Sequence, residues 1–223
     1  MFSAFTPVVL KLLWTATLET VYMTFASGFF GALFGIPLGV LLFTTRPGQI
    51  FEHKWLNHAL SAIVNLGRSV PFVILLVAII PFTMLLLGTF IGTTAAIVPL
   101  SVSAIPLVAR LVEGALLDVP AGLTEAARSM GASKLQIVWK FLLPEATPSL
   151  INTMTITLVS LVNYSAMAGT VGGGGLGYVG IQWGYQTYNP PILIATIVIL
   201  VVMVQAIQLT GDALVAHFRH RPR

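Results

Sequence analysis

Hydrophobic residues in this chain gather into three long stretches that contain no Asp, Glu, Lys or Arg, at residues 20–45, 69–109 and 146–211. A helix needs about 20 mainly apolar residues to cross the hydrocarbon core of a bilayer. The first stretch therefore predicts one membrane span. The second predicts two spans joined by a tight turn, and the third predicts two spans joined by a long uncharged connection.

This pattern predicts an all-α integral membrane protein with five transmembrane helices, organised as one domain over residues 1–223. The composition agrees, because 57% of the residues are hydrophobic and only 8% are charged, against about 25% charged in soluble domains. A soluble globular enzyme and a disordered linker are excluded. The chain has no Cys, which also excludes a disulfide framework, a Cys nucleophile and a Cys-ligated metal site.

Basic residues are distributed unequally around the five predicted spans, and cytoplasmic loops usually carry the excess. Only Lys11 falls on one side. The other ten of the eleven basic residues fall on the opposite side: Arg46, Lys54, Arg68, Arg110, Arg128, Lys134, Lys140, Arg219, Arg221 and Arg223. We therefore expect the N-terminus outside, with Lys11 and Glu19 near the outer interface, and the C-terminus in the cytoplasm. A basic region typical of signal peptides is absent, so we interpret the first span as uncleaved.

The loop between spans three and four, at about residues 118–144, carries the signals of two short helices. Pro120 suits a helix start, residues 121–130 form a short amphipathic pattern, and Gly131 suits the end of that helix. Ser133 with Gln136 forms a capping box that opens a second helix. With Pro144 expected to break the chain before span four, we expect a cytoplasmic helix–turn–helix.

Two other functions are possible for such a loop. Its second helix offers only Lys134 and Lys140 to phosphates, and it is tethered between two spans, so we do not expect nucleic-acid binding. An amphipathic loop that lies on lipid headgroups is the main structural alternative.

Glycine forms two notable patterns. Gly31, Gly35 and Gly39 recur every four residues, so they share one helix face and allow another helix to approach closely. We favour packing within the chain over a subunit interface. The run from Gly172 to Gly177 is not followed by Lys, so we interpret it as a flexible connection or a re-entrant segment and not as a phosphate cradle.

The sequence lacks several patterns that carry chemistry. It has no P-loop pattern, so the chain itself is not expected to hydrolyse ATP, and we expect no catalytic residue, metal or cofactor. We interpret His217 and His220 as part of a solvated basic tail. The stretches at residues 69–109 and 146–211 contain no ionisable acid, base or His, which disfavours an ion-coupled secondary transporter.

The predicted loop resembles the EAA loop of bacterial ABC-importer permeases. Glu125-Ala126-Ala127 is followed after three residues by Gly131, and after nine more by Phe141-Leu142-Leu143-Pro144. Phe141 stands where Ile is usual, which keeps the position apolar. Segments at residues 29–50, 68–72, 95–100 and 164–167, with the Gly-rich run, are similar to the methionine-importer branch of this family.

The resemblance implies a subunit of the bacterial inner membrane that pairs with a second copy of itself to form a translocation pathway for methionine, both L- and D-. It also implies two cytoplasmic ATPase subunits and an extracytoplasmic methionine-binding protein as partners. The residues implied in coupling to the ATPase are Glu125, Ala126, Ala127, Arg128, Gly131, Leu143 and Pro144. Transport of another amino acid is the alternative, because polar-amino-acid permeases share the loop.

The fourth span connects the loop with the Gly-rich run, so it is well placed to relay motion into the pathway. Tyr164, Ser165 and Met167 lie in its outer half. We expect these residues in the pathway or its gate, since a flexible apolar Met can close a narrow path and repack as it opens. Packing of Met167 against span five or lipid is the alternative.

The predicted orientation can be tested by labelling single Cys residues, because the chain contains none of its own. Gln49→Cys and Ser133→Cys should react only with reagent supplied from the cytoplasm. Thr89→Cys and Gln182→Cys should react only from outside. Reaction of Ser133→Cys with an impermeant reagent in intact cells would contradict the orientation.

Overall fold

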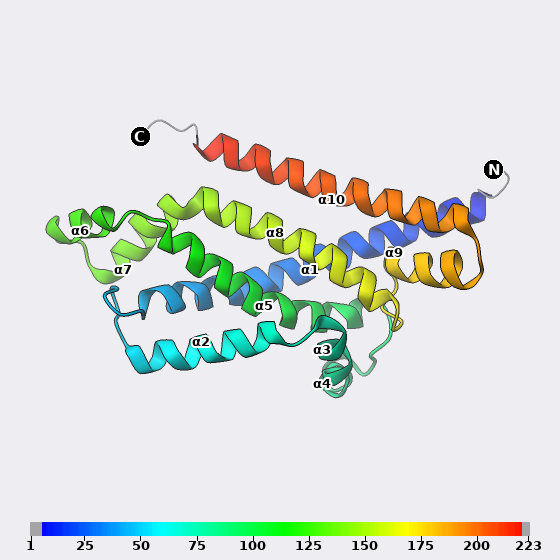
Figure 1. Ribbon diagram of the computed structural model, residues 1–223, viewed down its shortest axis with the longest axis horizontal. Helices are drawn as coiled ribbons and strands as arrows, with labels where there is room; N and C mark the ends of the chain where they lie inside the picture. Colours follow the sequence, from blue (N-terminus) through cyan, green and yellow to red (C-terminus); the bar gives the residue numbers. More distant parts are fainter. Residues whose placement is uncertain (1–5, 220–223) are drawn as a thin grey trace.

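The computed structural model describes residues 6–219, and these residues form helices with no β-strand. Four long helices run lengthwise, as Figure 1 shows: α1 (Pro7–Thr44), α5 (Thr93–Leu117), α8 (Leu143–Gly169) and α10 (Pro190–Arg219). The shorter helices are α2 (Lys54–Ser69), α3 (Phe72–Ala78), α4 (Ile80–Leu87), α6 (Ala121–Ser129), α7 (Lys134–Gln136) and α9 (Gly175–Tyr178). Two π-helical stretches, η2 (Ile137–Leu142) and η3 (Val179–Gln186), precede α8 and α10.

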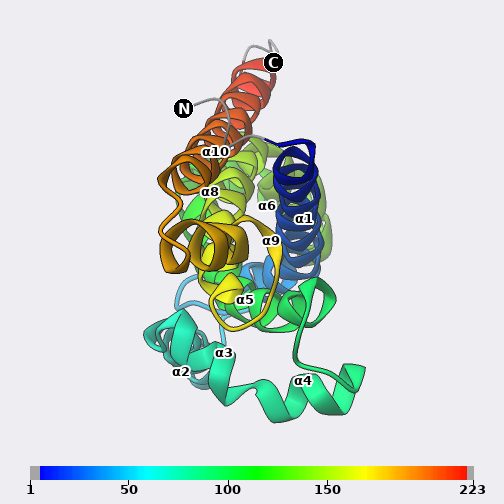
Figure 2. The same ribbon diagram turned by 90° about the vertical axis from the view of Figure 1, so that its right-hand side faces the viewer.

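The long helices extend between two opposite ends of the molecule. Figure 1 shows that α1 begins at one end, whereas α10 finishes toward the other end, the one that carries α6 and α7. Viewed along the long axis in Figure 2, α2, α3 and α4 form one flank and α10 lies on the opposite flank. We call the α6–α7 end the inner end and the other the outer end. The predicted tail residues His220, Arg221 and Arg223 lie outside the described residues.

Four helices in the described part are long and apolar enough to span a membrane, and α2 with α3 would make a fifth if this bent pair is one span. The all-helical membrane fold is therefore confirmed, with four to five candidate spans. Helices α1, α5, α8 and α10 correspond to spans one, three, four and five of the sequence prediction.

The glycine stripe of α1 packs against α5. A methyl group built on Gly31 would lie 2.7 Å from Ala104 Cβ, and one on Gly35 would lie 2.7 Å from Val108 Cβ. One on Gly39 would lie 2.6 Å from the carbonyl oxygen of Ala109. These distances are too short for any side chain, so glycine alone permits the contact. The interpretation as packing within the chain is confirmed.

The second span differs from the prediction. The sequence predicted a span that starts near Ser69, with Arg68 at its cytoplasmic end, but α2 already begins at Lys54 and meets α3 at an angle of 99°. Pro71 explains the bend, because the residue before a proline avoids helical dihedrals, and Val70 is extended (φ −82°, ψ 122°). Arg68 therefore lies at the far end of α2 from Lys54, and not at the inner end where the sequence prediction placed it.

Pro144 does not break the chain as predicted. Residues from Lys134 to Gly169 form one continuous helical segment, in which η2 ends just before Pro144. Proline cannot donate the backbone hydrogen bond of a regular helix. A wider π-helical stretch before it lets the chain continue without that bond. The loop therefore joins α8 directly.

The Gly-rich run forms an ordered corner rather than a flexible connection. Gly172, Gly174 and Gly175 have positive φ values of 90°, 76° and 72°, which favour glycine. The backbone N–H of Gly175 donates to Glu19 Oε2 at 2.7 Å, and that of Leu176 donates to Thr20 Oγ1 at 2.8 Å. The corner is thus tied to α1 and leads into α9.

The glycine stripe gives a test of the fold. Gly35→Ala forces a methyl group against Val108 and the Ile105 carbonyl, and overpacking of this kind costs about 1–3 kcal/mol. We therefore expect Gly35→Ala to lower the temperature at which the purified protein unfolds in detergent. Gly114→Ala on α5 is the matched control, because no atom lies within 4 Å of the added methyl. An equal decrease of the unfolding temperature in both variants would contradict the packing argument.

Candidate coupling surface and pathway residues

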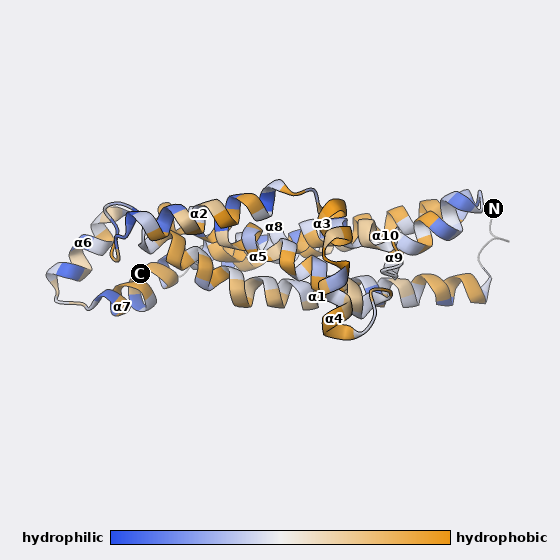
Figure 3. Ribbon diagram, turned by 90° about the horizontal axis from the view of Figure 1, so that it is seen from below, coloured by the Kyte–Doolittle hydropathy of each residue, from blue (hydrophilic) through white to orange (hydrophobic). Residues whose placement is uncertain are grey.

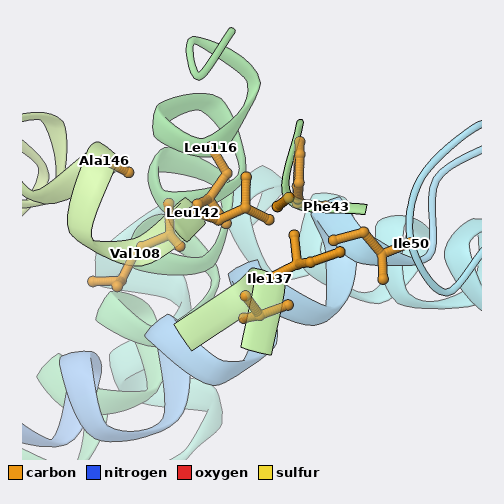
Figure 4. Close-up of a cluster of buried hydrophobic side chains, with 10 residues drawn as sticks. Phe43, Ile50, Val108, Leu116, Ile137, Leu142 and Ala146 are labelled. Carbon is orange, nitrogen blue, oxygen red and sulfur yellow. The ribbon is translucent and has the colours of Figure 1, made fainter. Parts of the chain in front are cut away.

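A buried apolar cluster fixes the α6–α7 segment to the helix bundle. Figure 4 shows side chains from α1, α5, η2 and α8 meeting at this point. Ala127 of α6 is completely buried in the cluster. The members of the cluster are Phe43, Ile50, Val108, Val112, Leu116, Ala127, Ile137, Val138, Leu142 and Ala146. Because Ala127 faces the interior of its own chain, its small size serves internal packing.

The opposite side of α6 is free in the chain. Glu125, Ala126 and Arg128 are exposed, as is Gly131 at the end of the helix. Two large apolar side chains of the same segment are also exposed, with Met130 70% exposed and Leu135 64% exposed. We call Glu125, Ala126, Arg128, Met130 and Leu135 the coupling surface. Its mixture of charged, small and apolar groups suits contact with another protein.

The turn between α6 and α7 has the geometry that the sequence indicated. Gly131 has φ 78°, and its N–H donates to the Arg128 carbonyl at 2.9 Å. Ser133 and Gln136 form the predicted capping box, since each side chain accepts from the other residue's backbone N–H. No atom lies within 4 Å of a methyl group built on Gly131. Only the backbone dihedral therefore demands glycine here.

The last two predicted coupling residues lie apart from the coupling surface. Leu143 is half-buried and Pro144 is exposed in the first turn of α8. Leu143 packs against the buried cluster. These two residues therefore join the loop to α8 rather than add to the exposed face of α6.

A charge network at the inner end was missed by the sequence analysis. The side chain of Glu113 on α5 is only 4% exposed; its Oε1 accepts from Arg46 at 3.1 Å and its Oε2 from Arg110 at 2.5 Å. The sequence could have identified Arg110 as a partner of Glu113, because it lies three residues before Glu113 on the same helix. Arg46 could not, because its contact depends on the close α1–α5 packing.

A cation–π contact also joins the loop to the α1–α2 connection. Lys134 Nζ lies 5.4 Å from the ring centroid of Phe51. Together with the buried cluster, this contact holds α7 against the rest of the chain.

The three predicted pathway residues occupy different environments. Tyr164 stacks on Phe72 of α3, with ring centroids 4.9 Å apart and planes within 9°. Ser165 is 1% exposed and its hydroxyl donates to the Val162 carbonyl at 2.7 Å, so it serves packing within α8. Met167 is 43% exposed. Of the three, Met167 offers the most open side chain.

Among the described residues, no group of three His, Cys, Asp or Glu side chains could hold a metal ion. His217 lies in the ring contact with Phe218, and His220 is outside the described range.

The sequence of the chain matches a known family. The family described as "Binding-protein-dependent transport system inner membrane component" matches residues 31–223. The chain belongs to this family. Its members are components of the inner membrane, as their description states.

Several named relatives are similar to this chain, two of them over nearly their whole length. The "Probable D-methionine transport system permease protein MetI" of Vibrio cholerae serotype O1 is 61% identical over 94% of this chain and 93% of its own length. The protein of that name from Pasteurella multocida is 52% identical over 97% of this chain and 100% of its own length. The "D-methionine transport system permease protein MetI" of Escherichia coli K12 is 61% identical over 68% of this chain and 70% of its own length.

Solved structures give the same picture. A chain of the "MetNI methionine ABC transporter" in an inward-facing conformation superposes with a TM-score of 0.95 and 54% identity, covering 96% of this chain and 99% of that chain. A chain from an amino acid ABC transporter with histidines has a TM-score of 0.72 at 20% identity, covering 95% of this chain and 94% of that chain. This second likeness shows the shared fold alone.

The charge network gives a further test. Glu113→Gln removes the charge that two arginines contact, and hydrogen bonds to charged groups contribute about 2 kcal/mol. We expect a corresponding loss of the free energy of unfolding. Glu52→Gln is the matched control, because Glu52 and Lys54 are exposed and 4.0 Å apart, and such pairs contribute about 0–1 kcal/mol. Similar losses for both variants would contradict a special role of Glu113.

Proposed function

We propose that the chain is the membrane-spanning subunit of an ATP-driven importer for methionine. The observation that carries the proposal is the 61% identity over almost the whole chain with a relative named as a D-methionine permease. The superposition on a chain of a methionine ABC transporter supports it. In this proposal two copies of the chain form the translocation pathway. Two cytoplasmic ATPase subunits drive it, and an extracytoplasmic binding protein delivers methionine.

The proposal includes five spans with the N-terminus outside and the α6–α7 segment in the cytoplasm. The fifth span is the bent pair of α2 and α3. An odd number of spans agrees with α1 beginning at one end of the molecule and α10 finishing at the other. The basic residues at the inner end favour the cytoplasm for that end.

The coupling surface is proposed to dock on the ATPase. Glu125, Ala126 and Arg128 would face the partner, with Met130 and Leu135 as apolar contacts. Ala127 would hold α6 to the bundle from behind, since it is buried in the apolar cluster. Motion of α6 would then pass through η2, Leu143 and Pro144 into α8.

Met167 is proposed as a gate residue near the outer end of α8. In a two-fold dimer, a pathway on the symmetry axis is lined by the same residue from both copies. Tyr164 would support the gate from behind through its stacking on Phe72. Ser165 is left out of the gate because it is buried in the chain.

The proposed function is tested by reconstituting the chain with its ATPase and binding-protein partners in vesicles. ATP-dependent uptake of L- and D-methionine is the expected result. Uptake of another amino acid with no response to methionine would contradict the substrate. Uptake that persists without ATPase and collapses with the ion gradient would contradict the class.

The turn at Gly131 gives a test of coupling. Gly131→Val places a β-branched residue at a positive φ, where it is strained, and should misaim α7 and uncouple uptake from ATP hydrolysis. Gly131→Asn is the matched control, because Asn tolerates this conformation better, so it should keep more uptake per ATP. The measurement is the ratio of methionine taken up to ATP hydrolysed. Equal ratios for wild type and Gly131→Val would reject the coupling role.

The gate is tested with Met167→Gly. We expect this variant to assemble normally and to leak methionine into vesicles in the absence of nucleotide, because two bulky side chains no longer close the path. A packing role predicts lower stability without a leak. An assembled Met167→Gly complex that does not leak methionine without nucleotide would count against Met167 as the sole gate.

A further inference from the structure

Helix α2 presents three different faces along its length. One face packs inward: Val64 is buried with Leu42 and Ala109, and the Asn57 amide donates to the Leu42 carbonyl at 2.7 Å. A second face is apolar and exposed, with Trp55 81%, Ile63 64% and Leu66 68% exposed. The third is polar and exposed, and we call it the polar face of α2. It consists of His58, Asn65, Arg68 and Ser69, which recur at three-, four- and seven-residue spacing on one side of a helix.

The polar face reaches the level of the middle of α5. A methyl group built on Gly67 would lie 3.1 Å from the ring of Pro106. Pro106 lies in the middle of α5 (Thr93–Leu117). Arg68 follows Gly67 directly. Figure 3 shows hydrophilic residues at both ends of α2, whereas α3 beyond it is hydrophobic. Arg68 thus lies level with the middle of α5 and not at the inner end.

An arginine at this depth does not reach water along a lipid-facing surface. The hydrocarbon core is about 30 Å thick, so its centre is about 15 Å from either interface, which is beyond the length of one side chain. Ionisable groups in spans face a bundle interior or a water-filled path, and they pair with one another or with backbone carbonyls. The apolar face of α2 can meet lipid, but the polar face needs a wet or paired environment.

The chain itself supplies no anion for Arg68. Among the described residues, no hydrogen bond or ion pair of the Arg68 side chain is present. The seven acidic residues of the sequence are Glu19, Glu52, Glu113, Asp118, Glu125, Glu145 and Asp212, and none lies in α2, α3, α4 or the outer half of α5. The nearest along α5, Glu113, is already bound by two arginines. A second copy of the chain brings only the same seven residues.

We propose that the polar face of α2 lines the translocation pathway and that Arg68 binds the α-carboxylate of the passing amino acid there. The proposal rests on the proposed import of methionine and adds a binding site to it. A guanidinium presents a planar fork that matches a carboxylate with two parallel hydrogen bonds. The substrate is thus the anion that the chain lacks at this depth. Asn65, one turn before Arg68, lies beside the site.

The first experiment places a reporter next to Arg68. Asn65→Cys is reconstituted with the ATPase and binding protein and exposed to a charged, water-soluble thiol reagent. We expect modification of this chain, slowed several-fold by L-methionine and not by L-methioninamide, which lacks the carboxylate. Ile63→Cys on the apolar face is the matched control and should stay unmodified.

The second experiment removes the guanidinium. Arg68→Gln in the Asn65→Cys background should leave the Cys reactive but abolish protection by L-methionine. Alone, Arg68→Gln should lower methionine uptake by about tenfold to a hundredfold, the range of a charge-assisted hydrogen bond, and Arg68→Lys should restore part of it. Lys54→Gln, which removes a charge at the inner end of the same helix, should leave uptake unchanged.

Three outcomes would overturn the proposal. An unreactive Asn65→Cys would show that the polar face does not meet water. Equal protection by L-methionine and L-methioninamide, or protection that survives Arg68→Gln, would show that Arg68 does not read the carboxylate. Loss of assembly in Arg68→Gln that Arg68→Lys repairs would assign Arg68 a structural role. If the wild-type complex takes up no methionine while Asn65→Cys still reacts, the proposed function fails and not the placement of α2.

Discussion

The close contact of α1 with α5 is the constraint on which the rest of the structure depends. Lipid tails are as apolar as the side chains between two spans, so burial from water does not drive their association, and close packing must do so. Gly31, Gly35 and Gly39 let the two backbones approach until Ala104, Val108 and Ala109 fill the space that side chains would occupy. This contact brings Arg46 within 3.1 Å of Glu113 at the inner end. At the outer end α1 also carries Glu19 and Thr20, which accept hydrogen bonds from the Gly-rich corner before α9.

The inner end joins the coupling surface to α8 through a buried cluster and a continuous helical segment. Ala127 is buried with residues of α1, α5 and η2, so α6 cannot shift without moving its neighbours. The helical segment from Lys134 runs through η2 into α8 as one body. The π-helical stretch is what permits this, because it absorbs the hydrogen bond that Pro144 cannot make. A break at Pro144 would instead have separated the loop from the span that it is proposed to move.

Much of this fold could be predicted from the sequence, because long uncharged stretches indicate membrane spans and short polar motifs indicate helix caps. The capping box at Ser133 and the positive φ at Gly131 follow from local chemistry. The start of α2 could not be found in this way. Residues 54–69 include Lys54, His58 and Arg68, so a search for uncharged stretches passes over an amphipathic helix that is buried on one side only. The sequence could not predict the partners of Glu113 and Glu19 either, because Arg46 and Gly175 come from distant parts of the chain.

Glu113 and Glu19 differ from Arg68 in whether the folded chain supplies a partner for the charge. Glu113 is almost fully buried, and burying a charge is costly unless partners satisfy it; Arg46 and Arg110 do so within the same chain. Glu19 is satisfied in the same sense by a backbone N–H. Arg68 is exposed, and the sequence places no acidic residue in α2, α3, α4 or the outer half of α5. A fixed partner would hold Arg68 permanently, whereas in the proposed site a substrate carboxylate would bind it only during passage. A site that must bind and then release is served by a charge left open in the folded chain.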